Sequence, residues 1–374
     1  MVLGFDITRM LGHRTGVGRD LEHLLGSWSR LDLPFDELVL YSPLPVADVP
    51  TDPRFRPTVL PWRGSPLLWQ TVRLRPRAQQ NSLFLSPYTL PLGYRGRSVV
   101  LNLGILEGPW ADTMPGLRSR ARSRHIAVSA RHASLLIANS PTTKRDIVRF
   151  YGVEPTRVRI VRPGVRDRFH HNANVTPAAK DAVVDAIVNP SARMLLFVGK
   201  LSVRRHVPAL IEAFATVVRD RPELRLLLAG PNTGNIPVDE LVERHRVRGL
   251  VRHVEFVDEE TLACLYRRAR GLVMLSEREG FSHPTLEAMS LGCPVIVLRN
   301  RALGVLDYAD GRDGLVLEAR DADPDSIADV LARLADDDEL HAALRERGIA
   351  FAAEFPTWSE HASATMEILA EVAG

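Results

Sequence analysis

Two glutamates with seven residues between them are the most informative chemical feature of the sequence. Glu279 lies in a loop predicted after an apolar strand, and Glu287 lies one turn inside a helix predicted to begin at Pro284. Proline suits the first helical position, because the amide hydrogen that it lacks would have no partner there. The remaining amides of such a helix N-terminus can bind a diphosphate. The two carboxylates could then contact different parts of one ligand, a sugar beside the diphosphate and a ribose behind it.

A second group of candidate residues follows the apolar strand predicted at 194–198. Gly199 ends this strand, and the cations Lys200 and Arg205 follow in the next loop. Two positive charges at the end of a strand could stabilise a departing diphosphate. The point charge of a lysine and the planar fork of an arginine differ in geometry, so the two positions are not interchangeable. A surface loop with solvated cations is the alternative interpretation.

The elements that must position these residues alternate along the whole chain. Short apolar runs rich in β-branched residues alternate with segments of helical period, which indicates parallel sheets covered on both faces. In the first half we predict strands at 2–5, 38–41, 83–85, 99–103, 134–138 and 158–161, and helices at 19–28 and 141–151. In the second half we predict strands at 194–198, 225–229, 254–257, 271–275, 294–297 and 314–317, and helices at 207–218, 259–268, 284–291 and 324–334.

The length of 374 residues and an irregular segment at 162–191 indicate two domains and a linker. We expect a Rossmann-like N-terminal domain at 1–165 and a second Rossmann-like domain at 166–355. The amphipathic segment 356–374 is predicted to be a helix that returns to the first domain. The predicted fold class is therefore α/β, with two doubly wound domains facing across a cleft. In such sheets ligands bind outside the carboxyl ends of the strands.

The segment EGFSHPTLEAMSLGCPVIV, which begins at Glu279, resembles the glutamate–seven–glutamate signature of the family 4 retaining glycosyltransferases of the GT-B fold. It follows a predicted strand, has Gly-Phe behind the first glutamate, and continues through Leu-Glu-Ala-Met to Gly-x-Pro-Val. The resemblance implies that Glu279 contacts the transferred sugar and that Glu287 binds the ribose. It also implies that the sugar and phosphate are held by the amides of Gly280, Phe281 and Ser282.

Two further segments resemble the same family. The segment LLFVGKLSVRRHVPALIEAF is similar to its strand–glycine–basic loop, in which two cations brace the donor diphosphate. The matching residues are Gly199, Lys200 and Arg205, although the family more often has arginine first and lysine second. In the first half, TGVGR at 15–19 resembles a glycine-rich turn in which Gly16 and Gly18 would close over the donor or admit the acceptor. An ordinary turn into a helix is the alternative for these two glycines.

The sequence departs from the family pattern after the strand predicted at 99–103. Many relatives have a His-Asp pair there, and its histidine reaches the donor sugar near the 6-position. This sequence reads NLGILEG, with Gly104 or a neighbour in that place. Candidate replacements on the acceptor side are Asn102, Glu107 and Tyr88. The departure leaves open an unusual or larger sugar, or a protein that binds a sugar nucleotide without turning it over.

The resemblance implies transfer of a sugar from a nucleoside-diphosphate sugar, a UDP- or GDP-sugar, with retention of anomeric configuration. The acceptor would be a small molecule, a lipid or a glycan, and neither a cofactor nor a metal is required. In the expected front-face route Lys200, Arg205 and the helix N-terminus stabilise the leaving diphosphate, which takes the acceptor's proton. Glu279 would orient the sugar. Alternatives are another GT-B enzyme, such as a sugar-nucleotide epimerase or a phosphorylase, and a silent sugar-nucleotide-binding protein.

The charge pattern gives no indication of a nucleic-acid partner. The net charge is +3, nearly all cations are arginines, and the densest basic stretch, 118–131, has no accompanying RNA- or DNA-reading motif. A solvated helix is the simplest interpretation of that stretch; contact with an anionic membrane or an acidic partner is the alternative. No signal peptide or membrane-spanning apolar run is readable, so we expect a cytoplasmic protein, with peripheral attachment to the inner membrane face left open.

Three sets of residues that resemble metal or redox motifs have simpler interpretations. Asp321 and Asp323 have the spacing of a metal-binding DxD motif, but Asp323 directly precedes a helical pattern that begins with proline, so we predict an N-cap. His170 and His171 lie in the predicted linker without a spaced metal-ligand partner. Cys264 and Cys293 fit neither a disulfide framework nor a metal spacing.

Overall fold

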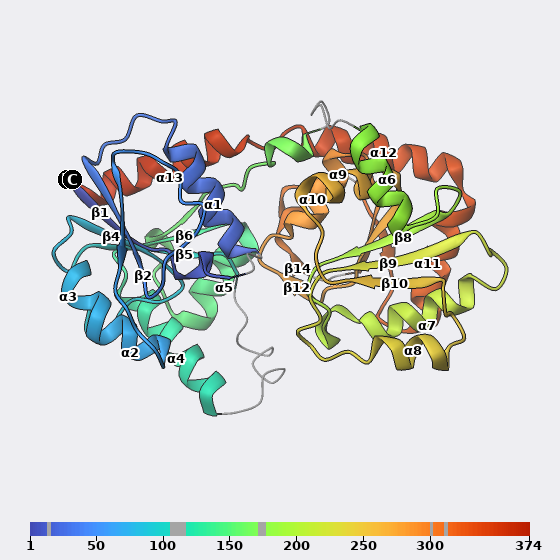
Figure 1. Cartoon of the computed structure of the whole chain (residues 1–374), viewed down its shortest axis with the longest axis horizontal. Coiled ribbons are helices and arrows are strands. Elements are labelled where there is room, and N and C mark those ends of the chain that lie inside the picture. The colour runs from blue at the N-terminus through green and yellow to red at the C-terminus, as the bar shows by residue number, and fades with distance from the viewer. Residues whose placement is uncertain (13–15, 105–116, 171–176, 300–301, 310–312) are drawn as a thin grey trace. The chain divides into compact units, whose positions relative to one another are not determined.

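The computed structural model describes residues 1–12, 16–104, 117–170, 177–299, 302–309 and 313–374. The chain divides into two compact units (Figure 1). Unit 1 comprises residues 1–164 and 356–374, and unit 2 comprises residues 165–355. The division falls one residue before the predicted boundary, and the C-terminal helix belongs to unit 1.

The sheet of unit 1 has seven strands in the order β3-β2-β1-β4-β5-β6-β7, and all neighbours pair in parallel. The strands are β1 (Val2–Asp6), β2 (Glu37–Ser42), β3 (Phe55–Val59), β4 (Leu83–Pro87), β5 (Ser98–Asn102), β6 (Leu135–Ala138) and β7 (Val158–Ile160). The sequence did not predict β3, because this edge strand contains Pro57 and is largely exposed, so it has no apolar run.

Helices cover both faces of this sheet, as expected of a parallel sheet. One face carries α1 (Val17–Trp28) and α13 (Trp358–Ala373), and the Trp28 Nε1 donates to the Ala362 carbonyl at 3.0 Å. The other face carries α3 (Arg75–Ala78), α4 (Leu117–His132), α5 (Pro141–Tyr151) and the π-helical segment η2 (Trp69–Leu74), which continues α2 (Pro66–Leu68). Short 3-10 turns lie at η1 (Thr8–Met10) and η4 (Pro155–Arg157).

The sheet of unit 2 has six parallel strands in the order β10-β9-β8-β11-β13-β15. They are β8 (Arg193–Val198), β9 (Leu224–Ala229), β10 (Val251–Val254), β11 (Ala269–Met274), β13 (Val295–Leu298) and β15 (Leu317–Ala319). Two sequence predictions are wrong here. The strand expected at 254–257 ends at Val254, and Phe256 is 62% exposed. The strand expected at 314–317 begins at Leu317, because Gly314 adopts a left-handed conformation with φ +71°.

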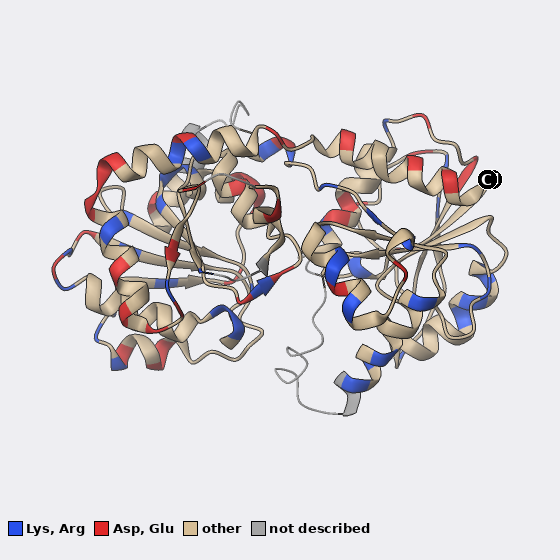
Figure 2. Ribbon diagram, turned by 180° about the vertical axis from the view of Figure 1, so that it is seen from behind, with Lys and Arg blue, Asp and Glu red and all other residues tan. Residues whose placement is uncertain are grey.

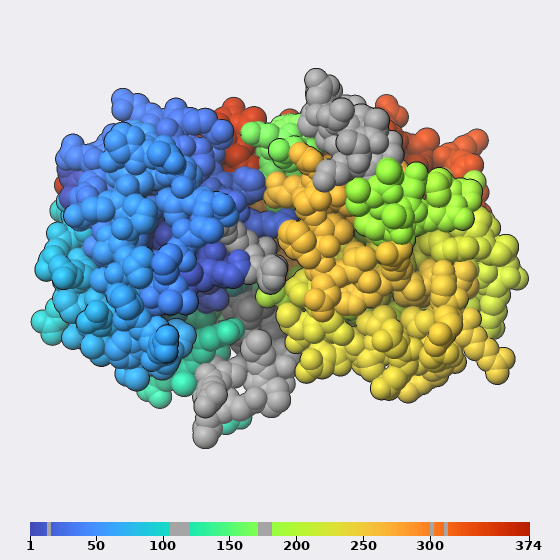
Figure 3. All heavy atoms as spheres, viewed as in Figure 1, coloured from blue at the N-terminus to red at the C-terminus, as the bar shows by residue number. Residues whose placement is uncertain are grey.

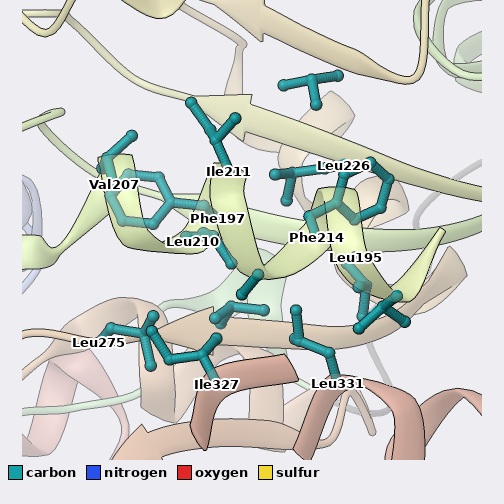
Figure 4. Packing of buried hydrophobic residues seen from close by; sticks show 14 of the residues in the cluster. Leu195, Phe197, Val207, Leu210, Ile211, Phe214, Leu226, Leu275, Ile327 and Leu331 are labelled. Atoms are coloured by element: carbon teal, nitrogen blue, oxygen red, sulfur yellow. The ribbon is translucent and has the colours of Figure 1, made fainter. Parts of the chain in front are cut away.

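Alternate residues of β8 supply the two cores of unit 2. Leu195 and Phe197 face α7 (Val207–Val217), α8 (Val238–Arg244) and α11 (Pro324–Asp336), and Figure 4 shows this packing from close by. Met194 and Leu196 face the opposite core, which includes residues of α6 (Pro177–Ile187), α9 (Glu259–Arg268), α10 (His283–Ser290), α12 (Asp338–Ala352) and the turn η5 (Asp167–Phe169). Each face of the sheet is therefore sealed by its own layer of helices.

The predicted linker at 162–191 is wrong in part, because it contains α6. This helix lies at the surface of unit 2, in green in Figures 1 and 3, and packs against α9. Its sequence, PAAKDAVVDAI, is rich in alanine, the best helix former. The proline and asparagine residues around it obscured the helical pattern. Helix α12 was also not predicted.

The strand order of unit 2 determines which loops can meet. From β8 the chain proceeds outward to β9 and β10 on one side, and from β11 to β13 and β15 on the other. The loops that leave the carboxyl ends of β8 and β11 therefore run in opposite directions. Ligands of doubly wound sheets bind at such a switch point. Both groups of candidate residues from the sequence follow these two strands.

Candidate functional site

An arginine–glutamate pair joins the loop after β8 to the loop after β11. Arg205 ends the 3-10 turn η6 (Val203–Arg205), and Glu279 ends the two-residue strand β12 (Arg278–Glu279). Arg205 donates to one carboxylate oxygen of Glu279, Oε1, from Nε at 3.0 Å and from Nη2 at 2.8 Å. The side chains of Arg205 and Glu279 are 15% and 19% exposed. The structure therefore brings two of the sequence-predicted residues into direct contact.

Arg204 is a third member of this cluster, and the sequence analysis missed it. Its Nη2 lies 3.4 Å from Glu279 Oε1, while its Nη1 donates to the Ser276 hydroxyl at 3.0 Å and to the carbonyl of Arg278. The Ser276 hydroxyl in turn donates to Glu279 Oε1 at 2.8 Å. The adjacent pair of arginines in SVRRH was the available signal, since either could have been the second cation of the loop.

These contacts determine the charge state of Glu279. Burial raises the pKa of a carboxyl group, but here the charges of Arg205 and Arg204 and the hydrogen bond from Ser276 outweigh burial, so the pKa of Glu279 is lowered. Glu279 is therefore ionised at neutral pH. Two guanidinium groups against one carboxylate leave a net positive charge at the carboxyl ends of β8 and β11.

Gly199 provides the space in which Arg205 lies. It has φ +135°, and a Cβ added there would come within 2.2 Å of Arg205 Nη1. The same Nη1 donates to the Lys200 carbonyl at 3.1 Å, which ties the side chain of Arg205 to the start of its own loop. The Lys200 side chain is exposed. Of the two predicted diphosphate-binding cations, Lys200 is therefore the more exposed, and Arg205 contacts Glu279.

The turn into α10 has an unusual backbone. Ser282 has φ +78° and precedes the first helical residue, His283, one position earlier than predicted. The Ser282 hydroxyl lies 2.8 Å from that of Thr285, and Val305 donates its amide to the Phe281 carbonyl at 2.8 Å. A left-handed non-glycine residue is uncommon and requires support from its surroundings. The Phe281 side chain is buried, so it is the backbone of Gly280–Ser282 that remains available for the predicted contact with a ligand.

Glu287 lies in a separate, more deeply buried network. Its side chain is 4% exposed and pairs through Oε1 with Arg166 Nη2, while its Oε2 accepts from the Tyr266 hydroxyl at 3.3 Å. Arg166 Nη1 also donates to Glu259 at 2.6 Å. Among the residues that the structure describes, Glu279 and Glu287 share no hydrogen-bond partner. Sequence reasoning missed Arg166, which lies in the predicted linker, 121 residues from Glu287.

The predicted residues of the first half lie in unit 1. Gly16 is the N-cap of α1 with φ +48° and open space around its missing side chain, and Gly18 is buried in the first turn of α1. Tyr88 has φ +66°, and its ring lies under the Arg9 guanidinium at 5.7 Å. Asn102 is buried at the end of β5, and its Oδ1 accepts from the amide of Gly104 at 3.4 Å. Glu107 lies outside the described residues.

Asp6 is a further polar residue at a strand end, and sequence reasoning missed it. It lies at the carboxyl end of β1, where the Thr8 hydroxyl donates to it at 2.7 Å and Gln70 Nε2 at 3.1 Å. Gln70 also donates to Thr89 at 3.1 Å. Burial raises the pKa of Asp6, although these hydrogen bonds oppose the rise. An aspartate directly after the first apolar strand could have been identified from the sequence.

The structure explains the aspartates and cysteines that resemble metal or redox motifs. Asp323 is the N-cap of α11 and accepts from the Asp325 amide at 3.0 Å, which confirms the prediction. Cys264 and Cys293 are buried, and neither forms a disulfide. In the part of the chain that the structure describes, no three or more His, Cys, Asp or Glu residues are grouped to hold a metal ion. Among the described helices, none is long and apolar enough to cross a membrane.

The fold of the whole chain is that of the GT-B glycosyltransferases. WaaG, a glycosyltransferase involved in lipopolysaccharide biosynthesis, superposes with a TM-score of 0.78 at 18% identity, covering 99% of each chain. HepE from Anabaena, solved in complex with UDP and glucose, superposes with a TM-score of 0.75 at 16% identity, covering 99% of this chain and 100% of HepE. At these identities the likeness concerns the fold.

A family model matches within unit 2, and curated sequences are similar to a larger part of the chain. Residues 185–351 match the family model of the glycosyl transferases group 1, in line with the resemblance seen in the glutamate spacing. The chain is 33% identical over 247 residues to D-inositol 3-phosphate glycosyltransferase 2 of Catenulispora acidiphila, covering 63% of this chain and 56% of the relative. For the D-inositol 3-phosphate glycosyltransferase of Thermobispora bispora the identity is 31%, covering 73% and 62%. The chain thus spans little more than half the length of these curated relatives.

Proposed function

We propose that this protein is a retaining glycosyltransferase that moves a sugar from a nucleoside-diphosphate sugar to a hydroxyl-bearing acceptor. The observation that carries the proposal is the contact of Arg204 and Arg205 with Glu279 at the ends of β8 and β11. It places an ionised carboxylate and a surplus of positive charge at the switch point of a domain that matches glycosyl transferases group 1. A sugar that carries a diphosphate needs both kinds of group.

Glu279 is oriented so that one carboxylate oxygen can serve a ligand. Among the described residues, all its hydrogen bonds end on Oε1. Since an ionised carboxylate has about four acceptor sites, Oε2 retains capacity for a sugar hydroxyl. We assign Glu279 the role of fixing the sugar and stabilising the positive charge that develops on it, rather than that of a nucleophile.

The cations stabilise the leaving group of the reaction. The exposed Lys200, with Arg205 and the N-terminal amides of α10, would stabilise the diphosphate as the bond between the sugar C1 and the phosphate oxygen breaks. The acceptor oxygen then bonds to C1 on the same face, and its proton passes to the departing diphosphate oxygen. Anomeric configuration is retained, and no step requires a metal ion.

The donor that we propose is a UDP- or GDP-sugar. HepE structures with UDP and with UDP-glucose support a uridine nucleotide, since HepE shares the fold over the whole chain. The relatives named D-inositol 3-phosphate glycosyltransferases support an acceptor that presents a sugar-like hydroxyl. A small molecule, a lipid or a glycan would meet that requirement.

Product analysis tests this function. The protein is incubated with UDP-glucose or GDP-mannose and a set of inositol phosphate, lipid and glycan acceptors, and products are identified by mass spectrometry and ¹H NMR. We expect transfer with retained configuration, lost in Glu279→Gln and kept in Glu277→Gln. Glu277 is a suitable control because it lies in the same loop but pairs with His206 at 3.1 Å. An epimerised nucleotide sugar without acceptor, or binding without turnover, would establish the epimerase or the silent binding protein instead.

We also propose peripheral contact of unit 1 with an anionic membrane, at the cytoplasmic face. From Pro53 to Leu106 the sequence has eight arginines and no lysine, aspartate or glutamate. Within this stretch Leu68 and Val72 are 53% and 55% exposed beside the exposed Arg73. Helix α4 also carries arginines and no acidic residue (Figure 2). Exposed apolar side chains with cations around them favour an anionic bilayer.

Vesicle sedimentation tests the membrane contact. The protein should sediment with vesicles of phosphatidylcholine and phosphatidylglycerol, and much less with phosphatidylcholine alone. Both Leu68→Gln/Val72→Gln and Arg120→Gln/Arg122→Gln/Arg124→Gln should reduce sedimentation, whereas Val183→Gln/Phe256→Gln, at exposed apolar residues of unit 2, should not. Equal sedimentation of the first two variants and the wild type would contradict the contact.

A further inference from the structure

Arg166 is a buried cation whose interactions converge on Glu287. Its side chain is 8% exposed, and its guanidinium donates to Glu287 through Nη2 and to Glu259 through Nη1. The guanidinium carbon also lies 4.7 Å from the centre of the Phe169 ring. A buried charge is tolerated only where it is paired and hydrogen-bonded, so an arginine with this many partners is held in one orientation.

Both carboxylate oxygens of Glu287 are held by hydrogen bonds. Oε1 pairs with Arg166, and Oε2 accepts from Tyr266, whose ring meets Phe169 edge to face at 5.9 Å. Two donors leave part of the acceptor capacity of a carboxylate unused. The arrangement therefore holds Glu287 in one orientation while leaving it able to accept hydrogen bonds from a ligand.

We propose that Arg166 is a positioning residue for recognition of the nucleotide ribose, acting through Glu287 and assisted by Tyr266. The inference rests on the proposed function, in which Glu287 accepts the ribose hydroxyls of the donor. Arg166 itself need not touch the donor. Its fork joins Glu287 on α10 to Glu259 on α9, and the single ammonium of a lysine could not make the same two contacts with the same geometry.

Arg168 provides a matched control. It lies two residues further along the same turn and donates to Glu260, the neighbour of Glu259, at 2.6 Å. The side chains of that pair are 56% and 41% exposed, and an exposed ion pair contributes little to stability. Arg166→Gln and Arg168→Gln thus remove the same charge from positions two residues apart, but only the first releases Glu287.

The test compares nucleotides with and without ribose hydroxyls by isothermal titration calorimetry of the full chain. The probes are UDP and GDP with their 2′,3′-dideoxy forms. For the wild type we expect a preference for the ribose form of about tenfold or more, since a hydrogen bond to a charged group has roughly that value. In Arg166→Gln the preference should fall to about threefold or less, with the affinity for the dideoxy form little changed. Arg168→Gln should behave as the wild type, and Arg166→Lys should recover only part of the preference.

Two further variants separate positioning from a general structural effect. Tyr266→Phe removes only the hydroxyl on Oε2 and keeps the ring, so it should reduce the same preference even if Arg166→Gln fails to fold. In Glu287→Gln the preference should already be lost, and adding Arg166→Gln should lower it no further, because residues that act as one unit are not additive.

The outcomes separate this inference from the proposed function. If the wild type binds UDP or GDP but Arg166→Lys and Tyr266→Phe keep the full preference for ribose, the role of Arg166 is overturned while the proposed function stands. Equal weakening of ribose and dideoxy forms would also overturn it, since that result indicates a structural role. If neither UDP nor GDP binds the wild type, both proposals fail.

Discussion

Arg205 donates through both Nε and Nη2 to a single carboxylate oxygen of Glu279, at 3.0 and 2.8 Å. The pair joins the loop after β8 to the loop after β11, the two strands between which the order of the unit 2 sheet reverses. In the proposed reaction one residue serves the leaving diphosphate and the other the sugar. Their contact means that a change in either loop alters both ends of the donor site.

The space beside Gly199 gives the first prediction. Gly199→Ala should destabilise the protein by about 1–3 kcal/mol, because φ +135° is strained for alanine, and should also displace Arg205 from Glu279. We expect donor affinity to fall by about tenfold in calorimetry. Gly249→Ala is the control, since Gly249 has φ +76° but nothing within 4 Å of an added Cβ. Equal donor affinity in the two variants would show that Gly199 does not hold Arg205 in place.

The lowered pKa of Glu279 gives a prediction on pH. A carboxyl group whose pKa is lower in the folded than in the unfolded state stabilises the fold above its unfolded pKa. That contribution is lost as the pH falls below the ordinary value of 4.5 towards the folded pKa. Urea unfolding between about pH 6 and pH 3.5 should therefore show a steeper loss of stability for the wild type than for Glu279→Gln. Parallel curves would mean that Arg204 and Arg205 do not stabilise the ionised form.

Helix α13 should be required for the stability of unit 1. Leu369 is fully buried in the core that α13 shares with α1, so Leu369→Ala should cost about 2–5 kcal/mol in urea unfolding. Thr357 and Glu360 form a capping box at the start of α13, and Thr357→Ala should cost about 1 kcal/mol. Glu371→Ala removes only an exposed ion pair with Arg159 and should change stability by less than about 1 kcal/mol. A Leu369→Ala protein as stable as the wild type would contradict the assignment of α13 to this core.

The sequence predicted the strands and helices whose residues form a recognisable pattern over a short segment. Runs such as 194–198 revealed the parallel strands, because such strands are apolar on both faces. The polar edge strand β3 and helix α6, which lies among proline and asparagine residues, carry no comparable local pattern and were missed.

The candidate site was likewise predictable only where its residues lie close together in the sequence. The glutamate spacing identified Glu279 and Glu287, since sequence pattern reveals residues on one turn or loop. It gave no indication that Arg166 pairs with Glu287, because that contact depends on how η5 packs against α10. It also could not show that Arg205 turns toward Glu279, which depends on the meeting of two loops 74 residues apart.

The proposed function requires that a nucleotide sugar binds at the ends of β8 and β11, and calorimetric titration with UDP-, GDP- and ADP-sugars measures this binding. We expect at least one of them to bind the wild type, with affinity reduced about tenfold or more in Lys200→Ala and Arg205→Ala. The control, Arg219→Ala, removes an exposed arginine elsewhere in unit 2 and should leave binding unchanged. Absence of binding to the wild type, or equal affinity in all three variants, would contradict the account.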